Sequence, residues 1–448
     1  MTVRELALLM LDEYELEGKY VNLLLKSHRA DNLTREERAS LTALLYTVTE
    51  HKYTYDYYIC AASARSGSDI DPRTLNILRL GVCQIVDMSA IPDFAAVNET
   101  VKLARNKGEA AFVNAVLRKI SRLKNEDKLP LPDRKKNPAR YLAVAYSFPL
   151  WLAKHFIALI GEEATERLLG HFNTYNSTDL TVNTLKISRD GLIGLLKAKG
   201  FEAAQSPISP LTVRIAGSVN PTELPGFDEG YFFVQDSASA LSAAVLSPSK
   251  GDSIIDVCAC PGGKSFAATI LAEDGGRVAS FDIHESKLSL VTDGAKRLGL
   301  NSITIGMQDA REIKEELVGA FDRVICDAPC SGLGVLGKKA DMRYRDPEGM
   351  KELPELQYEI LSAASRYLRV GGYMVYSTCT LNPEENEAVV RRFLDAHGDF
   401  ALVPFNVGEL VAEAGMLTLW PHIHNTDGFF ISKLTRLEAE EKGGTRDE

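Results

Sequence analysis

The sequence of 448 residues contains no uninterrupted apolar run of the roughly 20 residues that a membrane-spanning helix requires. Residues 1–12 include Arg4 and Glu5 and show no signal-peptide cleavage pattern. A hydrophobic fraction of 45% and a charged fraction of 25% are ordinary for globular proteins, and the length suggests about two or three domains. We therefore expect a cytoplasmic protein that has no membrane partner.

Cysteine is scarce and unevenly placed. The chain has 7 cysteines, an odd number, and Cys258, Cys260, Cys326, Cys330 and Cys379 fall within three short loop phrases. A secreted disulfide framework would instead spread an even number at regular spacings. Zinc is another ordinary use of cysteine, and Cys258 and Cys260 lie two residues apart, but no second Cys or His pair has finger-like spacing. We therefore expect neither a disulfide framework nor a bound metal.

Positive charge is also in short supply. The formal net charge is −10, and the excess of acidic residues lies beyond residue 236, because the preceding part is close to neutral. A protein that binds nucleic acid along its length is usually basic, so RNA binding would have to rely on local patches. Charge alone leaves a nucleic-acid partner open. The two best candidate patches are Arg134-Lys135-Lys136 with Arg140, and Lys338-Lys339 with Arg343 and Arg345.

Residues 1–125 have the pattern of an all-helical bundle. Apolar residues recur at helical spacing, and no strand-like alternation of any length appears. Thr34, with a glutamate three positions later, predicts a capping box, and Pro72 predicts a first helical turn. Residues 97–99 are expected to open a further helix, and residues 112–118 to lie in the helix that closes the bundle.

The rest of the chain divides by composition and pattern. Residues 126–137 are charged and broken by prolines, which is typical of a linker, and residues 138–235 mix helices with short alternating strands, which indicates a small α+β domain. From 236 to 437 strands and helices alternate, as in a mostly parallel, doubly wound sheet, and residues 438–448 form a charged tail that we expect to be disordered. The strands expected in this sheet are 253–257, 277–282, 302–307, 323–326, 373–376 and 428–433.

Three loops follow expected strands of this sheet and carry the residues of chemical interest. They span residues 256–265 (DVCACPGGKS), 324–332 (VICDAPCSG) and 371–380 (GGYMVYSTCT). Because the carboxyl ends of strands line one crevice in an open sheet, we expect these loops to form a ligand site. The first loop lacks the glycine spacing of a Walker A motif and of a dinucleotide fingerprint, which argues against a nicotinamide dehydrogenase. Its Pro-Gly-Gly turn instead lets a ligand approach the backbone closely.

Carboxylates follow the next three expected strands. Asp282 ends the second strand about 20 residues beyond the glycine turn, where a carboxylate commonly binds ribose hydroxyls. Asp309 follows the third strand and Asp327 the fourth. Such negative surroundings suit a nucleoside cofactor with a cationic sulfonium better than one with a pyrophosphate. Any one of these acids could instead only cap a helix, although three caps in a row are much less expected.

Two cysteines occupy positions that suggest covalent catalysis on an electrophilic carbon. Cys330 lies in a tight turn rather than inside a strand. Cys379 precedes residues 382–385 (NPEE), which predict a capped helix with Pro383 as its first residue. A helix N-terminus lowers the pKa of a nearby thiol from its usual value of about 8.5, so we expect the helix to activate Cys379. The other loop cysteines lack such settings and are expected to be small structural residues.

The three loop phrases resemble motifs of RNA (cytosine-5) methyltransferases, whose usual forms are close to Asp-x-x-Ala-Ala-Pro-Gly-Gly-Lys-Thr, Asp-Ala-Pro-Cys-Ser-Gly and Ser-Thr-Cys-Thr. Residues 97–99 (VNE) and 112–118 (FVNAVLR) resemble a NusB-like RNA-binding domain, and 182–186 (VNTLK) and 233–236 (FVQD) resemble further family phrases. Taken together, residues 1–435 look like the small-subunit ribosomal RNA methyltransferases of the RsmB (Sun) type.

The sequence departs from these family patterns at a few positions. Cys260 replaces the usual Ala before Pro-Gly-Gly, and Ser265 replaces Thr, which are both small changes. Further along, Ala340 stands where Pro is usual and Tyr344 where Trp is usual. None of these changes removes a group with a chemical role from the three loops.

The resemblance implies a multidomain protein with an all-α NusB-like helical bundle in residues 1–125. A small α+β RNA-binding domain would follow in 138–235, and an α/β Rossmann-like methyltransferase domain in 236–437. The implied cofactor is S-adenosyl-L-methionine, and the implied partner is 16S ribosomal RNA. The implied reaction is methyl transfer to carbon 5 of a cytosine, carried out by a monomer.

The resemblance also assigns roles to individual residues. Cys379 would be the nucleophile that bonds carbon 6 of cytosine, Cys330 would assist release, and Asp327 would contact N3 of the base. Two alternatives stay open: a noncatalytic RNA-binding scaffold, and a methyltransferase with the same chemistry that acts on transfer RNA or another ribosomal site. The expected cofactor contacts are Cys258, Ala259, Cys260, Pro261, Gly262, Gly263, Lys264, Asp282, Asp309 and Asp327.

Overall fold

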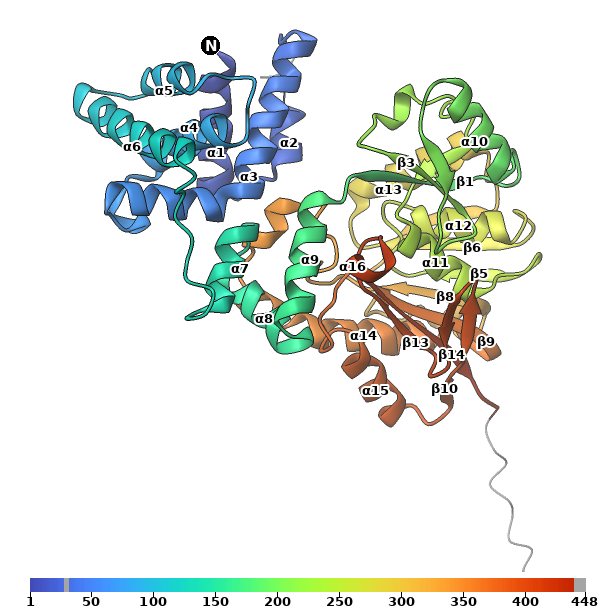
Figure 1. The fold of residues 1–448 in the computed structure, drawn as a ribbon. Coiled ribbons are helices and arrows are strands. Elements are labelled where there is room, and N and C mark those ends of the chain that lie inside the picture. Colours follow the sequence, from blue (N-terminus) through green and yellow to red (C-terminus); the bar gives the residue numbers. More distant parts are fainter. Residues whose placement is uncertain (28–31, 439–448) are drawn as a thin grey trace, which may run out of the picture. The chain divides into compact units, whose positions relative to one another are not determined.

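Figure 1 shows the computed structural model, which describes residues 1–27 and 32–438. The chain forms two compact units. Unit 1 contains Met1–Thr174 and Leu336–Arg345, and unit 2 contains Tyr175–Val335 and residues 346–438. The charged tail expected at 438–448 lies outside the described residues, except for residue 438. The narrower domain limits expected from the sequence stay predictions.

Unit 1 is helical, as the spacing of its apolar residues predicts. Its helices are α1 (Val3–Glu17), α2 (Val21–Leu25), α3 (Arg35–Ser63), α4 (Pro72–Val86), α5 (Asp93–Val101), α6 (Lys107–Asn125), α7 (Pro138–Tyr146), α8 (Leu150–Ile160) and α9 (Glu162–Thr174). Thr34 caps α3 in the expected capping box, and Pro72 is the first residue of α4. Residues 97–99 do not open a helix, because α5 already begins at Asp93, where Pro92 fixes the backbone for helix entry.

Two further features of unit 1 bear on the expectations. No helix or strand occurs in residues 126–137, all of which are described, as expected for a linker. In the described part of the chain no single helix is long and apolar enough to span a membrane; α7 and α8 reach the required length and composition only together, as a pair bent by 119°.

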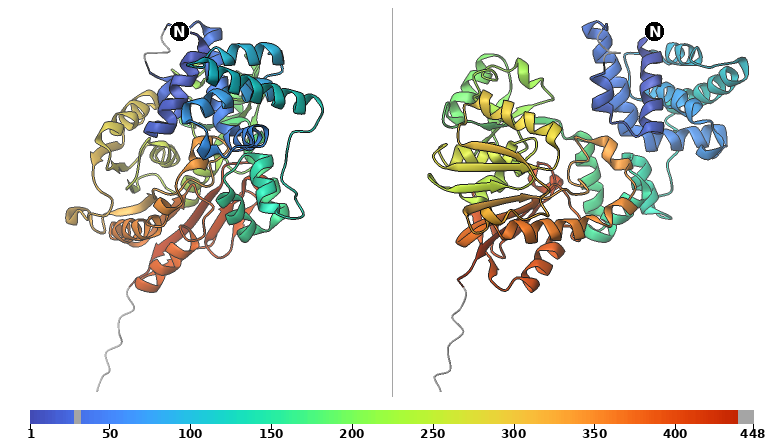
Figure 2. Two further views of the ribbon diagram at one scale, coloured as in Figure 1. Left: turned by 90° about the vertical axis from the view of Figure 1, so that its left-hand side faces the viewer. Right: turned by 180° about the vertical axis from the view of Figure 1, so that it is seen from behind.

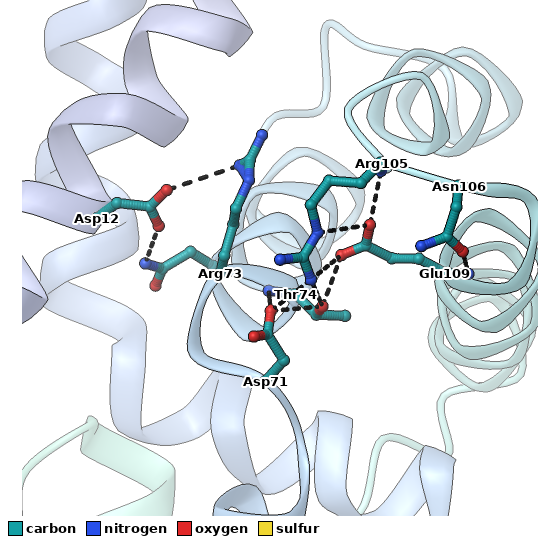
Figure 3. A network of polar contacts seen from close by, with 8 residues as sticks. Asp12, Asp71, Arg73, Thr74, Arg105, Asn106 and Glu109 are labelled. Atoms are coloured by element: carbon teal, nitrogen blue, oxygen red, sulfur yellow. Dashed lines mark hydrogen bonds and ion pairs between the residues drawn. The ribbon is translucent and has the colours of Figure 1, made fainter.

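A network of polar side chains joins α4 to α6 (Figure 3). Arg105 donates from Nη2 to Asp71 Oδ2 at 2.8 Å and to Glu109 Oε1 at 3.1 Å. Thr74 also donates to Glu109 Oε1 at 2.6 Å. Asp71, which caps α4, and Glu109, in the first turn of α6, therefore share the cation of Arg105. Single exposed ion pairs contribute little, whereas a network of this kind orders its members. It therefore fixes the connection between α5 and α6.

The first part of unit 2 is a small antiparallel sheet with one helix packed on it. The strands are β1 (Ser177–Val182), β2 (Ala203–Gln205), β3 (Thr212–Ala216) and β4 (Phe232–Val234), in the order β2-β3-β1-β4, and the helix is α10 (Arg189–Ala198). Alternate strand residues, among them Leu180, Val182 and Val213, share a core with Leu192 and Leu196 of α10. The α+β character expected from the alternating pattern is confirmed.

The second part of unit 2 is an eight-stranded sheet in the order β10-β14-β9-β8-β5-β6-β7, with β13 paired to β14. Its members are β5 (Ser253–Asp256), β6 (Arg277–Asp282), β7 (Ile303–Met307), β8 (Phe321–Asp327), β9 (Leu368–Thr378), β10 (Phe400–Leu402), β13 (Met416–Leu419) and β14 (Phe429–Arg436). Strands β5 to β9 are parallel, and β14 runs antiparallel to β9. All the expected strands are present, whereas the short antiparallel strands β10 and β13 were not expected.

Helices cover both faces of this sheet (Figures 1 and 2). On one face lie α11 (Ser237–Leu246) and α12 (Gly263–Leu271), with α13 (Glu285–Leu298) beside α12; on the other lie α14 (Leu353–Ser365) and α15 (Glu387–Ala396). Val324 and Cys326 pack with α14 and α15, whereas Ile325 between them packs with α11 and α12. Burial on both faces explains the apolar runs of the strands. The doubly wound sheet is thereby confirmed.

The strand order reverses in the middle of the sheet. From β5 the chain continues outward through β6 and β7, and it then returns to form β8 and β9 on the opposite side of β5. Open α/β sheets bind ligands at the carboxyl ends of their strands where the order reverses in this way. The three loops of chemical interest leave the carboxyl ends of β5, β8 and β9, and they therefore meet at this edge.

Candidate active site

The loop after β5 turns sharply into α12. Ala259 N donates to Phe281 O at 2.8 Å, which ties the loop to β6. Gly262 has a φ of +112°, and a Cβ atom at this position would lie 2.4 Å from a ring carbon of Phe266. Only glycine fits such a turn. The amide groups that begin α12 thus face the edge of the sheet, at a helix end that attracts polar and negative ligand groups.

Asp282, at the end of β6, lies against the same loop. Its carboxylate accepts hydrogen bonds from Cys260 N at 3.0 Å and from His284 N at 2.9 Å. Asp309, after β7, is held by Arg311, whose guanidinium and backbone amide both donate to it. This pairing keeps the pKa of Asp309 below its ordinary value. The structure therefore brings Asp282 to the glycine turn and pairs Asp309 with a neighbouring arginine.

An ion pair joins the loop after β5 to the end of β8. Lys264 Nζ donates to Asp327 Oδ2 at 2.6 Å and to Ser239 Oγ at 3.0 Å, and the side chain of Lys264 is only 11% exposed. Ser377 Oγ donates to the other oxygen, Asp327 Oδ1, at 2.7 Å. Asp327, at the end of β8, is thus oriented by residues from α12 and β9. Lys264 acts as the counter-ion of this carboxylate.

The two cysteines that the sequence singles out lie side by side. Cys330 follows β8 and Cys379 follows β9, and their Sγ atoms are 3.2 Å apart, within hydrogen-bond distance for sulfur. Both side chains are half-buried. The adjacent Cys379 sulfur, together with burial, holds the pKa of Cys330 well above its ordinary value. Cys330 therefore keeps its proton and is positioned to share it with Cys379.

One buried glutamate fixes these two loops to each other. Glu385 Oε2 accepts hydrogen bonds from Ser331 N at 2.8 Å and from Gln357 Nε2 at 2.9 Å. Glu385 Oε1 accepts from Asn382 Nδ2 at 3.1 Å. Sequence reasoning missed this role, because residues 382–385 have the pattern of a helix start. The acidic residue at the end of this phrase, Glu385, could have indicated a buried carboxyl group.

The helix after Cys379 begins later than expected. It starts at Glu387, and residues 383–386 form a turn that carries Glu385 inward. The predicted helix start at Pro383 is therefore wrong, and the helix begins eight residues after Cys379. The nearest group described beside the Cys379 sulfur is the sulfur of Cys330.

Backbone contacts draw the same loops together. Gly334 N donates to Cys379 O at 3.0 Å, and Gly428 N, just before β14, donates to Gly334 O at 2.8 Å. A Cβ atom on Gly334 would lie 1.9 Å from Gly428 O and 2.8 Å from Cys379 O. The chain after Cys330 therefore lies directly against the backbone of Cys379, with no room for a side chain between them.

The remaining loop cysteines differ in kind. Burial holds the pKa of Cys258 well above its ordinary value and also raises that of Cys326. Burial and Asp282 together raise the pKa of Cys260 to about 11. These thiols therefore stay protonated at neutral pH. Within residues 1–27 and 32–438, no group of three or more His, Cys, Asp or Glu side chains could hold a metal ion.

A second buried acid, Asp256, lies at the end of β5. It accepts hydrogen bonds from Ser265 Oγ at 2.7 Å and from Cys258 N at 3.4 Å, and Ser280 donates in turn to Ser265. Burial raises its pKa to about 7. Sequence reasoning quoted Asp256 only as the first residue of the loop phrase. An acid between a buried strand and a glycine turn was the signal that could have identified it.

The basic patches predicted for RNA binding are less available than their sequence suggests. Arg134 donates to Glu162 at 2.9 Å and to Glu166 at 2.6 Å, so acidic partners already occupy it. Arg343 is 1% exposed, and its place in a surface patch is a wrong prediction. Only Lys338 and Lys339 of the second patch are exposed.

Comparisons with known proteins agree with this fold and site. Three family models match: the 16S rRNA methyltransferase RsmB/F over residues 243–435, the NusB family over residues 1–122, and the RsmF/B-like ferredoxin-like domain over residues 148–222. A Bacillus subtilis protein named "Probable ribosomal RNA small subunit methyltransferase B" is 35% identical, over 97% of this chain and 99% of its own.

Solved structures give the same result. The crystal structure of PH0851 superposes with a TM-score of 0.77 at 26% identity, covering 97% of this chain and 99% of that chain. The structure of NSun6 from Pyrococcus horikoshii with SFG has a TM-score of 0.58 at 25% identity, covering 66% of this chain and 100% of that chain.

The fold, the glycine turn and the carboxylates define an S-adenosyl-L-methionine-dependent methyltransferase. With a relative that is 35% identical over almost its full length, the chain belongs to the RsmB/F family of ribosomal RNA small-subunit methyltransferases. The NusB-like bundle, the small α+β domain and the Rossmann-like methyltransferase domain expected from the sequence are confirmed, and the α+β domain matches a ferredoxin-like family model.

Replacing Asp256 with Asn is expected to remove a pH dependence of stability. Burial raises the pKa of this acid from 3.8 unfolded to about 7 folded, so its contribution is complete below pH 3.8 and is lost as the pH rises to 7. Between about pH 5 and 7, the free energy of unfolding of the native chain should fall by up to about 1.4 kcal/mol per pH unit relative to Asp256→Asn.

Urea unfolding followed by tryptophan fluorescence would measure this difference. The chain has 2 tryptophans, Trp151 in unit 1 and Trp420 in unit 2, so a Trp151→Phe background reports on unit 2 alone. If the free energies of unfolding of the native chain and of Asp256→Asn differed by the same amount at every pH, Asp256 would not be protonated in the folded protein.

Proposed function

We propose that this chain transfers a methyl group to carbon 5 of a cytosine in 16S ribosomal RNA, with Cys379 as the nucleophile. The observation that carries the proposal is the pair of sulfur atoms of Cys330 and Cys379, 3.2 Å apart at the ligand edge of the sheet. Relatives that match nearly the whole chain are named for small-subunit ribosomal RNA, which favours this substrate over transfer RNA.

The cofactor would be held by residues 258–264 with Asp282, Asp309 and Asp327. The fit rests on the tight glycine turn at Gly262, where a Cβ would lie 2.4 Å from the ring of Phe266, and on carboxylates that suit both hydroxyl groups and a cation. When bound, S-adenosyl-L-methionine supplies a methyl carbon made electrophilic by its sulfonium sulfur. The thiols and the charged pair at Asp327 are the chemical groups that the chain itself contributes.

Carbon 5 of cytosine is a poor nucleophile and must be activated. Addition of the Cys379 thiolate to carbon 6 opens the double bond between carbons 5 and 6 and leaves an electron pair at carbon 5. The negative charge that spreads into the ring is stabilised at N3 by Asp327. Asp327 would act there as a general acid that gives its proton to N3, and Lys264, 2.6 Å away, would be the counter-ion of the carboxylate that forms.

Release reverses the addition. Loss of the carbon 5 proton re-forms the double bond and expels the Cys379 sulfur as a thiolate. Cys330 keeps its proton because its pKa is raised, and it lies close enough to donate a hydrogen bond to the departing sulfur. Cys330 thereby assists release by stabilising the departing thiolate, while a water molecule accepts the carbon 5 proton; it acts as a partner of Cys379 and not as a second nucleophile.

The target base has to leave its stack to reach the thiols. Extrusion costs a few kcal/mol and is cheapest for an unpaired base, so the substrate cytosine is expected in a loop or an otherwise open stretch of RNA. The helical bundle of unit 1 matches the NusB family and would contribute RNA contacts outside the site.

Replacing Cys379 with Ala is expected to lower methyl transfer by at least about a thousandfold, because the addition step loses its nucleophile. Binding of S-adenosyl-L-methionine should remain within about twofold of native, since Cys379 is not among the proposed cofactor contacts. The product, 5-methylcytosine, is read by bisulfite sequencing of small-subunit RNA. Cys326→Ala, which removes a buried thiol one residue before Asp327, is the matched control and should retain activity. Full activity of Cys379→Ala would refute the nucleophile assignment.

Replacing Cys330 with Ala is expected to trap a covalent protein–RNA complex, because the addition step proceeds and release is no longer assisted. The complex should appear as a slowly migrating band on a denaturing gel and should require both S-adenosyl-L-methionine and RNA. The double variant Cys330→Ala/Cys379→Ala should show no such band. If Cys330→Ala alone gives no band, Cys330 has no part in release.

Replacing Asp282 with Ala is expected to weaken S-adenosyl-L-methionine binding more than about tenfold, because the carboxylate both supports the glycine turn and faces the proposed ribose site. Isothermal titration calorimetry measures the change. Asp293→Ala, an exposed acid on α13, serves as the control and should bind with native affinity. An unchanged affinity for Asp282→Ala would reject the ribose contact.

A further inference from the structure

The segment Leu336–Arg345 has an unusual place in the fold. It packs with unit 1, whereas the residues before and after it pack with unit 2. The segment starts two residues after Gly334, whose amide donates to the carbonyl oxygen of Cys379. One end of the Cys330 loop is therefore fixed by contacts within unit 2, and the chain continues at once into a different unit.

Arg343 anchors this segment within unit 1. Its side chain is 1% exposed and donates to three backbone carbonyls: Leu336 O at 3.1 Å, Glu50 O at 3.3 Å and Ser147 O at 3.4 Å. The guanidinium also lies over the ring of Phe148, 4.0 Å from its centroid. A single side chain thus joins the segment to α3 and to the connection between α7 and α8.

The anchor is a buried cation whose hydrogen bonds go to backbone oxygens, including that of Glu50. Burial lowers the pKa of Arg343, as expected for a cation taken out of water, and the nearby charge of Glu50 partly opposes this shift. Such burial is costly unless hydrogen bonds satisfy the guanidinium, and the three carbonyl groups provide them here.

Close packing reinforces the anchor. Gly337 lies so near α9 that a Cβ atom on it would be 2.9 Å from Phe172 O. Lys52 of α3 lies over the ring of Tyr344, 4.7 Å from its centroid. The segment, which ends in a 3₁₀ helix at Ala340–Tyr344, is therefore held at several points along its length.

We propose that Arg343 is a positioning residue for methyl transfer, which limits the motion of the Cys330 loop by holding the segment after it in unit 1. The proposal rests on the role in release proposed for Cys330. Freed from this anchor, the loop would open more often, and the sulfur of Cys330 would spend less time beside that of Cys379.

The first test measures the reactivity of individual thiols in the full-length protein. Iodoacetamide alkylation read by peptide mass spectrometry should be at least about fivefold faster at Cys330 in Arg343→Met than in the native chain, because local opening exposes the thiol. Cys258, in the loop after β5, should react at the native rate. An unchanged rate at Cys330 would overturn the proposal. This reading needs neither RNA nor cytosine chemistry, so it is independent of the proposed function.

The second test uses catalysis and separates positioning from cofactor binding. Single-turnover methyl transfer should fall about tenfold in Arg343→Met, while the Kd for S-adenosyl-L-methionine stays within about twofold, since no cofactor contact is touched. Arg343→Lys keeps a cation with fewer donors and should recover part of the rate. An equal loss of cofactor affinity, or a native rate in Arg343→Met, would overturn the positioning role.

Two further variants keep the test decisive. Gln84 is a buried polar residue of α4 that donates to Leu80 O and Thr100 Oγ1, and Gln84→Met should disturb unit 1 without changing Cys330 alkylation. If Arg343→Met fails to fold, Gly337→Ala displaces the same segment by a different contact and should also accelerate alkylation of Cys330. Faster alkylation of Cys330 in Gln84→Met, or an unchanged rate of alkylation in Gly337→Ala, would refute the inference.

Discussion

The candidate site depends on the burial of one carboxyl group, that of Glu385. A carboxyl group inside a protein is tolerated only when hydrogen-bond donors surround it. Glu385 obtains its donors from the Ser331 amide after β8, from Gln357 of α14 and from Asn382 in its own turn. Because these donors come from separate elements, satisfying one acid fixes two loops. The contact between the sulfur atoms of Cys330 and Cys379 is a consequence of that constraint.

The charged groups at the edge of the sheet serve structure and chemistry together. An ionised carboxylate has about four acceptor positions, so two backbone amides on Asp282 leave room for ligand hydroxyls. Asp327 is likewise oriented by Lys264 and Ser377 before any base arrives. A structural role and the proposed binding role, between which the sequence left the choice open for these acids, are therefore compatible. The same hydrogen bonds that shape the loops also aim the carboxylates.

Sequence reasoning located the parts of this protein whose signals are local. A few neighbouring residues decide where a helix or strand begins or ends. Such local signals located the cap at Thr34, the helix start at Pro72, the strand ends at Asp256 and Asp327, and the glycine turn at Gly262. It failed where partners distant in sequence decide the outcome. Pro383 fits the rules for a helix start, but the donors around Glu385 draw that turn inward, and α15 begins four residues later. Arg343 stands near two lysines, which predicts a surface position, yet it is buried and donates to the backbone oxygen of Glu50, 293 residues away in sequence.

The position of β14 has a consequence for synthesis. This strand is the last one described, and it lies between β9 and β10, next to the strand that leads to Cys379. The amide of Gly428, at its start, is also hydrogen-bonded to Gly334. A nascent chain can complete the helical bundle of unit 1 early, because that bundle draws mainly on the first part of the sequence. The catalytic sheet, by contrast, must wait for residue 436 to emerge from the ribosome. A nascent chain that has not yet reached β14 therefore cannot complete the site.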